Sequence, residues 1–357
     1  SSDVCSSDLK NRNFPIDFLR TLGLFAIILA HVSPPLFISQ LRSFDVPLMV
    51  ILSGFVFALT KKTDETEFKL NTYIKNRFIR LVVPVWVFLS FFFPLVFISA
   101  QILNIPFPFD GPKILSTYLL WEGIGFVWII RIFLMMSLFG PLFIKKIDKF
   151  KNKLKTIFIL YILYEISFFL YSKIFFHIND TMEEIIRKSI FYLIPYLLFF
   201  AYGVYFKKIK QKTLSYIIFL LTSLLIFGIE YNFLKYGTYP KFQHFKYPAS
   251  SFYTVYALLI STLLLKNLDI FEKIKSYKFR KLIHFIGSYT LWIYLWHIPI
   301  TLFLHFAGFD YVFTKYIIII SISVFIVFIQ QKLLNFFLKR SVVLKNKEEA
   351  LKTIFIG

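Results

Sequence analysis

The sequence is poor in cysteine and in charged residues, above all in acidic ones. Of its 357 residues one is Cys and 17% are charged, with 20 Asp and Glu against 41 Lys and Arg, a formal net charge of +21. A single Cys cannot form an internal disulfide, which excludes a disulfide-stabilised scaffold. The sequence also has no internal repeat, glycine-rich phosphate loop or closely spaced histidine cluster. We therefore expect no bound metal.

Apolar residues are abundant instead. Hydrophobic residues make up 57% of the chain and aromatic residues 21%, with 48 Phe and a mean hydropathy of +0.68. A soluble domain is about half apolar and about a quarter charged, so most of this chain must lie in a bilayer. The Lys and Arg residues stand in short clusters between apolar runs, which is typical of membrane proteins and argues against a nucleic-acid partner.

Ten apolar segments are candidates for membrane-spanning helices, since a helix needs about 20 apolar residues to cross roughly 30 Å of hydrocarbon. We therefore predict an all-α integral membrane protein with about ten transmembrane helices. A further apolar stretch, 113–121, is too short to span and is expected at the interface. The predicted spans are 18–38, 45–60, 81–101, 126–144, 154–175, 188–206, 213–234, 249–265, 285–305 and 312–337.

The connections between these segments alternate in charge. Basic clusters precede the first segment and follow the second, fourth, sixth, eighth and tenth, whereas the other connections hold few basic residues. An excess of Lys and Arg marks cytoplasmic loops, so the alternation predicts that both termini are cytoplasmic.

The domain organisation is expected to be simple. Residues 1–9, SSDVCSSDL, match nothing downstream in composition, and we expect a non-native or disordered tail. Residues 10–340 are expected to form one transmembrane domain, and 341–357 a cytoplasmic tail. No connection is long enough to hold a soluble domain, so any chemistry must come from residues in the spans and short loops.

The first predicted span carries the most informative ionisable residues, because such side chains are costly inside a membrane and are functional candidates. His31 follows Arg20 by eleven residues, about 16 Å along a helix and close to three turns, so both are expected on one face. Pro34 and Pro35 then end or kink the helix. A cation at the cytoplasmic mouth and a deeper imidazole suit an anionic substrate entering from inside. The alternative is that His31 makes a polar contact between helices.

Other basic residues permit two interpretations each. Arg77 and Arg80 lie one helical turn apart at the cytoplasmic entrance to the third span, and either grip phosphates or anchor the topology. In the fourth span, Trp128 and Arg131 either line a site or Arg131 forms a structural ion pair with Glu165.

Taken in order, these residues stand in motifs that resemble the membrane acyltransferase-3 family. Ile16-Asp-Phe-Leu-Arg20 followed by His31 resembles the family's opening, an Arg, ten residues and a His. The run Val46–Phe55, which contains Ser53, resembles its second helix ending in Ser-Gly-Phe. Asn76–Pro84 resembles its Arg-x-x-Arg with a following Pro.

The resemblance continues through the second half of the chain. Trp128 to Arg131 resembles the Trp-aromatic-x-Arg run of a subset of the family, although Phe126 stands where some members carry a His and Ile129 where an aromatic residue is usual. Lys246-Tyr-Pro248 resembles a Tyr-Pro element before the eighth helix. Ile286–His297 resembles the ninth-helix signature ending in Tyr-Leu-x-His.

The resemblance implies a bacterial enzyme of the cytoplasmic membrane. Such an enzyme takes an acyl group, usually acetyl, from cytoplasmic acyl-CoA and passes it to a hydroxyl of an envelope or extracellular carbohydrate. Its expected partners are the bilayer, the carbohydrate acceptor and, because no fused extracytoplasmic esterase-like domain follows, an extracytoplasmic partner enzyme.

The same reasoning predicts roles for individual residues. His31 is the expected general base, because an imidazole titrates in the right range to deprotonate an alcohol, or less directly an acyl carrier. Arg20 is assigned to the catalytic site and, with Arg77 and Arg80, to the CoA phosphates. Further candidates for the substrate site are Ser53, Trp128, Arg131, Tyr289 and His297. The competing hypothesis is a polysaccharide exporter, which needs no acyl-transfer chemistry.

Overall fold

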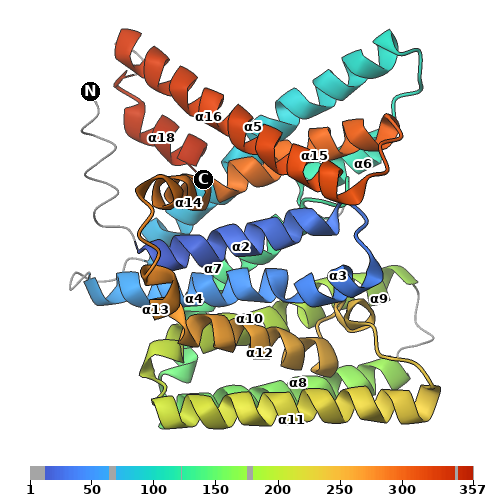
Figure 1. The fold of residues 1–357 in the computed structure, drawn as a ribbon, viewed down its shortest axis with the longest axis vertical. Helices are drawn as coiled ribbons and strands as arrows, with labels where there is room; N and C mark the ends of the chain where they lie inside the picture. Colours follow the sequence, from blue (N-terminus) through green and yellow to red (C-terminus); the bar gives the residue numbers. More distant parts are fainter. Residues whose placement is uncertain (1–12, 64–69, 122, 175–179, 342–344, 357) are drawn as a thin grey trace. The chain divides into compact units, whose positions relative to one another are not determined.

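The protein is built from helices. The computed structural model describes residues 13–63, 70–121, 123–174, 180–341 and 345–356, and within these ranges it contains no β-strand (Figure 1). The predicted all-α class is therefore confirmed, while the predicted tail, 1–9, lies outside the described residues. The helices form two compact units. Unit 1 comprises Ser1–Pro34, Asn71–Leu134 and Ile274–Gly357, and unit 2 comprises Pro35–Leu70 and Met135–Lys273.

Unit 1 is organised around α2, which packs against α14, α15 and α16. The helix α15 in turn packs against α16 and α18. The helices of this unit are α2 (Phe14–Ala30), α5 (Leu70–Ile102, in this unit from Asn71), α6 (Gly111–Tyr118), the start of α7 (Trp128–Ile147), α14 (Tyr277–Ser288), α15 (Thr290–Phe306), α16 (Val312–Arg340) and α18 (Glu348–Ile356).

The two ends of α2 follow from its sequence. At the start, the Asn13 side chain accepts a hydrogen bond from the backbone N–H of Ile16, and Pro15 lies in the first turn, where its missing N–H costs nothing. At the other end, Pro34 and Pro35 cannot continue the helix, and Ser33 adopts a positive φ of 54°. The predicted break at these prolines is confirmed.

The predicted extent of the first span, 18–38, is wrong. The helix α2 ends at Ala30 with His31 as its C-cap, and a separate helix, α3 (Leu36–Leu41), begins after the prolines. Hydropathy alone does not detect this interruption, because the residues on both sides of the two prolines are equally apolar.

Unit 2 has α4 and α10 at its centre, with α12 packed against α4 and α8 against α10. The helix α11 packs against α12. The helices of this unit are α3, η1 (Arg42–Phe44), α4 (Asp45–Thr63), the rest of α7, α8 (Lys153–Ile174), α9 (Asp180–Ile186), η2 (Arg187–Phe191), α10 (Tyr192–Tyr205), η3 (Phe206–Lys208), α11 (Gln211–Tyr236), η4 (Phe242–Phe245), α12 (Ser251–Lys266) and α13 (Leu268–Glu272).

Two glycines allow α4 and α10 to touch along their backbones. A Cβ atom at Gly54 would lie 2.0 Å from the carbonyl oxygen of Phe200, and one at Gly203 would lie 2.0 Å from that of Ile51. Neither position has room for any side chain. Small residues that permit such close approach are characteristic of helix packing inside membranes.

Seven helical segments in the described residues are long and apolar enough to cross a membrane, which identifies a multi-pass membrane protein. They are Leu36–Thr60, Leu70–Ile102, Trp128–Ile147, Lys153–Lys173, Glu183–Lys208, Gln211–Tyr236 and Val312–Arg340, and two shorter apolar helices are Ser251–Lys266 and Thr290–Phe306. Each of these nine segments overlaps one of the second to tenth predicted spans, although the ninth, 285–305, also includes the end of α14 and Tyr289, the residue between α14 and α15. The number of crossings and the side of each terminus stay predictions.

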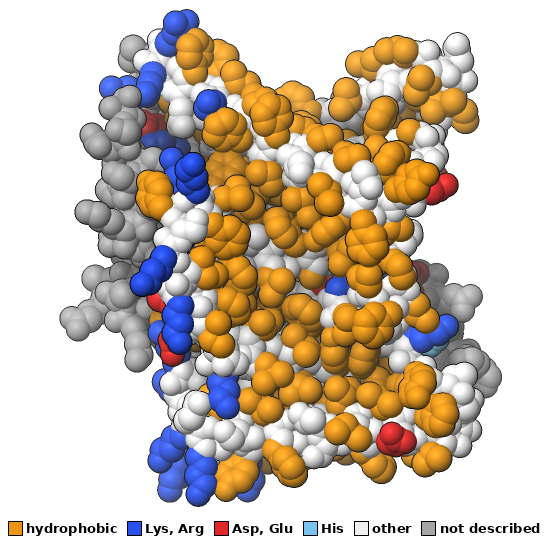
Figure 2. Space-filling model, viewed as in Figure 1, with side chains coloured by type: hydrophobic (Ala, Val, Ile, Leu, Met, Phe, Trp, Pro, Cys, Tyr) orange, Lys and Arg blue, Asp and Glu red, His pale blue; other side chains and the backbone are white. Residues whose placement is uncertain are grey.

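The surface of unit 2 fits a hydrocarbon environment. Figure 2 shows hydrophobic side chains along α11 and α12, with Lys and Arg gathered at the end of this face where α11 begins. On α11, Phe219 is 73% exposed, Phe227 68% and Leu234 82%. When large apolar side chains along a single helix are this exposed, they contact lipid rather than water.

Candidate active site

His31 lies at the carboxyl end of α2, where the chain leaves the helix. Its backbone N–H donates to the carbonyl of Ile28 at 3.0 Å, and its side chain is half-buried. The helix α2 presents the negative end of its dipole here, which favours a positive charge on a side chain at this position.

His297 lies within α15 and is completely buried. Its Nδ1 is hydrogen-bonded to the carbonyl oxygen of Tyr294, one turn earlier. A carbonyl only accepts, so Nδ1 carries the hydrogen and a neutral His297 has its lone pair on Nε2. Within the described residues, this Nε2 has no hydrogen-bond partner.

The packing of α2 against α15 brings the two imidazoles together. Their ring centroids are 5.2 Å apart, and the ring of Phe126 contacts both, at 4.6 Å from His31 and 5.6 Å from His297. Phe126 precedes α7, and its carbonyl accepts a 2.6 Å hydrogen bond from the hydroxyl of Tyr294. Three separate segments of unit 1 thus converge on one imidazole pair.

The segment before α7 has a defined shape. Gly123 and Gly125 have positive φ angles of 53° and 79°, a conformation that favours glycine. The hydroxyls of Ser116 and Thr117, on α6, accept hydrogen bonds from the backbone N–H groups of Gly123 and Ile124. These contacts hold Phe126 in place beside the pair.

Arg131, one turn into α7, is 7% exposed. Its guanidinium lies 4.7 Å from the centroid of the Trp121 ring, a cation–π contact. Glu165, the sequence-based alternative partner of Arg131, accepts hydrogen bonds from Tyr161 at 2.5 Å and Ser251 at 2.8 Å within unit 2. Trp128 is half-buried at the start of the same helix.

Arg20 has a partner that sequence reasoning did not assign. Its Nη1 lies 3.4 Å from Oδ1 of Asp17, while Oδ2 of Asp17 lies 2.9 Å from Nδ1 of His284 on α14. Asp17 is 2% exposed, and a Cβ atom at Gly287 would lie 2.8 Å from its Cβ. The buried carboxylate therefore joins α2 to α14. In the sequence, the signal for this contact is Asp17 itself, an acidic residue beside the first predicted span to which no partner was assigned.

The remaining predicted residues belong to α5, to α4 and to the junction of α14 and α15. Arg77 lies on α5 with its guanidinium 5.2 Å from the Tyr73 ring centroid, and Arg80 is exposed one turn later. Ser53 belongs to unit 2, where its hydroxyl donates to the carbonyl of Met49 at 3.0 Å. Tyr289 separates α14 from α15, and its ring packs 4.8 Å from that of Phe285.

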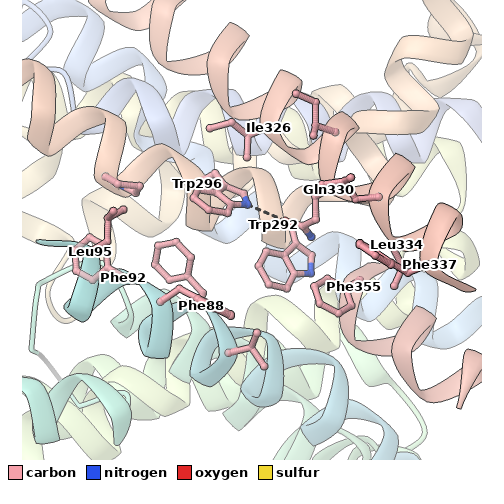
Figure 3. A pocket seen from close by; sticks show the side chains of 15 residues that line it. Phe88, Phe92, Leu95, Trp292, Trp296, Ile326, Gln330, Leu334, Phe337 and Phe355 are labelled. Atoms are coloured by element: carbon pink, nitrogen blue, oxygen red, sulfur yellow. Dashed lines mark hydrogen bonds between the residues drawn. The ribbon is translucent and has the colours of Figure 1, made fainter. Parts of the chain in front are cut away.

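An apolar groove of about 610 Å³ lies among α5, α15, α16 and α18 of unit 1 (Figure 3). Trp296 donates from Nε1 to Oε1 of Gln330 at 2.8 Å, and Trp292 stacks on Phe355 of α18 with ring centroids 5.3 Å apart. The described residues that line the groove include no charged side chain, so it does not suit the phosphates of CoA. Trp292 and Trp296 share one face of α15, and His297 points from another.

In the described part of the chain, no three His, Cys, Asp or Glu side chains gather as a metal site would require.

A family model described as an acyltransferase domain matches residues 14–330. No curated protein and no solved structure matches the chain. The family match includes α2, the segment before α7, and α15, and thus all three parts of the imidazole pair's surroundings.

Proposed function

Because the chain belongs to the acyltransferase-3 family, we propose that it transfers an acyl group, acetyl in the first instance, from cytoplasmic acyl-CoA to a hydroxyl of an envelope carbohydrate. The proposed location is the bacterial cytoplasmic membrane. The observation that carries the proposal is the contact between His31 and the buried His297, because acyl transfer to an alcohol needs a base held in a defined position.

In the proposed reaction, the acceptor hydroxyl attacks the carbonyl carbon of the thioester. His31 accepts the hydroxyl proton as the new C–O bond forms. The C–S bond then breaks. The CoA sulfur takes the proton that His31 returns, and CoA leaves as the free thiol. The base is regenerated in each cycle, and no redox step or metal is required.

His297 is proposed to position His31 and its proton. It is fully buried, so the half-buried His31 is the more accessible of the two to a substrate. The Nε2 lone pair of His297, fixed by the hydrogen bond to Tyr294, is available to accept a hydrogen bond from a protonated His31 or from the substrate hydroxyl.

The donor is proposed to bind with its phosphates at Arg20, Arg77 and Arg80. Arg20 lies about 16 Å from His31 along α2, a span that the long, flexible pantetheine arm of CoA bridges. Guanidinium groups match phosphate oxygens in a planar, bidentate geometry. Arg20 is held beside Asp17, so in this proposal it binds the donor and does not reach the reacting atoms.

The experiment that tests the proposal is release of the CoA thiol from acetyl-CoA by the protein in lipid, with crude envelope glycan as acceptor. We expect acceptor-dependent release by the wild type and none by His31→Ala. The matched control is His305→Ala, because His305 is exposed at the end of α15 and outside the proposed site. Acetyl-CoA-independent glycan export without thiol release would favour the exporter hypothesis instead.

A further inference from the structure

Unit 2 contains a buried charged cluster that the proposed reaction does not use. Asp45, at the start of α4, is 1% exposed, Arg42 is 8% exposed, and Lys246, just before α12, is 3% exposed. Nη1 of Arg42 lies 2.5 Å from Oδ2 of Asp45, and Nζ of Lys246 lies 3.4 Å from Oδ1. We refer to these three residues as the Asp45 cluster.

The Asp45 cluster has an excess of positive charge. It contains two cations and one carboxylate, and it lies at a helix that is long and apolar enough to cross a membrane. Buried charges without a counter-charge are strongly unfavourable, and ionisable residues in membrane spans generally mark functional sites. One further negative charge would neutralise the cluster.

The cluster also has more hydrogen-bond donors than acceptors. The carboxylate of Asp45 already accepts from Arg42, from Lys246 and from the backbone N–H of Val46 at 2.8 Å. Tyr196 on α10 and Tyr253 on α12 are 1% and 0% exposed. Among the described residues, neither of their hydroxyls has a hydrogen-bond partner, and the same holds for Nε of Arg42.

The two tyrosines lie close enough to the cluster to feel its charges. Tyr253 interacts electrostatically with Asp45, Arg42 and Tyr196, and Tyr196 interacts with Asp45. Buried polar groups are almost always satisfied, so several unsatisfied donors around one site indicate an acceptor that belongs there.

We propose that the Asp45 cluster, together with Tyr196 and Tyr253, binds one oxyanion, a carboxylate or a phosphate. Guanidinium, ammonium and hydroxyl groups are the donors that such anions prefer. Asp45 holds both cations in place and leaves one net positive charge for the ligand. The ring of Tyr247 lies 5.5 Å from Nζ of Lys246 and Tyr247 is 40% exposed, so the cluster is close to the protein surface.

The test measures anion binding directly and does not depend on acyl transfer. The full-length protein in lipid nanodiscs is titrated with inorganic phosphate or with glucuronate at constant ionic strength, against sodium chloride and neutral glucose. All five Trp residues lie in unit 1, so unit 2 is followed by hydrogen exchange of α4 and α12. We expect at least tenfold slower exchange in both helices at saturating oxyanion.

The two anions distinguish the sources of the ligand. Protection by glucuronate and not phosphate would assign the site to a sugar acid, and the reverse would assign it to a phosphate group. Either result supports an oxyanion site. No protection by either anion beyond that in chloride or glucose would overturn the proposal.

Single hydroxyl deletions separate binding from structure. Tyr253→Phe removes a hydroxyl that has no hydrogen-bond partner among the described residues, so exchange without the anion should be unchanged or slower, while oxyanion affinity falls about tenfold. Tyr202→Phe is the matched control on α10, because its hydroxyl is 2.8 Å from that of Thr262, and it should leave the affinity unchanged. Lys246→Met should abolish protection. Wild-type affinity in both Tyr253→Phe and Lys246→Met would refute the site.

Discussion

Replacing Gly54 with Ala is expected to force α4 and α10 apart. The new Cβ would lie 2.0 Å from the carbonyl oxygen of Phe200, whereas an ordinary van der Waals contact begins at 3.4 Å. The obstacle is the backbone of a helix, so no side-chain rotation relieves it and the helices must separate by more than an ångström. Gly203 faces the backbone of Ile51 in the same way.

The magnitude follows from two opposing terms. Overpacking of a well-packed interface costs up to about 3 kcal/mol, and Ala returns about 1 kcal/mol through its better helix propensity. The expected net destabilisation of unit 2 is therefore about 2 kcal/mol. Because one separation of the helices relieves both contacts, the Gly54→Ala/Gly203→Ala double variant should lose about 1 kcal/mol less than the two single effects together.

Hydrogen exchange of peptides from α4 and α10 measures this effect. A loss of about 2 kcal/mol corresponds to about 30-fold faster exchange where the whole unit opens. Gly111→Ala is the control, because nothing lies within 4 Å of a Cβ at that position. Unchanged exchange in Gly54→Ala, or equal acceleration in Gly111→Ala, would refute the argument that backbone contact holds these helices together.

Three further predictions concern unit 1. Tyr294→Phe removes the 2.6 Å hydrogen bond to the carbonyl of Phe126, so kcat should fall about tenfold with acetyl-CoA affinity retained, as steady-state kinetics and calorimetry would show. Arg77→Ala should raise the KM for acetyl-CoA about tenfold and leave kcat at saturation nearly unchanged. An unchanged KM would indicate that Arg77 does not bind CoA and only anchors the membrane topology. Asp17→Asn removes the carboxylate between Arg20 and His284, and should destabilise unit 1 by about 3 kcal/mol. The unfolding transition followed by tryptophan fluorescence measures this loss of stability, because all five Trp residues lie in unit 1. An unfolding transition unaltered by Asp17→Asn would contradict the prediction.

Much of the helical structure is predictable from hydropathy. A chain in hydrocarbon must satisfy its backbone hydrogen bonds within each segment, so long apolar runs become helices wherever the sequence allows. This is why the second to tenth predicted spans each overlap an apolar helix. Two predicted spans cross a break in the helix. The first, 18–38, contains Pro34 and Pro35, whose local effect on the backbone outweighs an uninterrupted apolar pattern. The ninth, 285–305, crosses the break at Tyr289 between α14 and α15.

The contacts of the candidate site are less predictable. His31 and His297 were each recognisable, but their contact depends on how α2 packs against α15. The partners of buried carboxylates were also missed. Asp17 meets His284 across two helices, and Asp45 meets Lys246 across 201 residues of sequence. Sequence spacing describes the faces of one helix but carries no information on which helix lies opposite.

The most direct test of the proposed acyl transfer is the appearance of ester-linked acetyl groups on envelope glycan, measured by mass spectrometry after incubation with isotope-labelled acetyl-CoA and the protein in lipid. We expect labelled glycan with the wild type and with His305→Ala. We expect none with His31→Ala, although that variant should still bind acetyl-CoA. Labelled glycan at the wild-type rate from His31→Ala would contradict the assignment of His31 as the base.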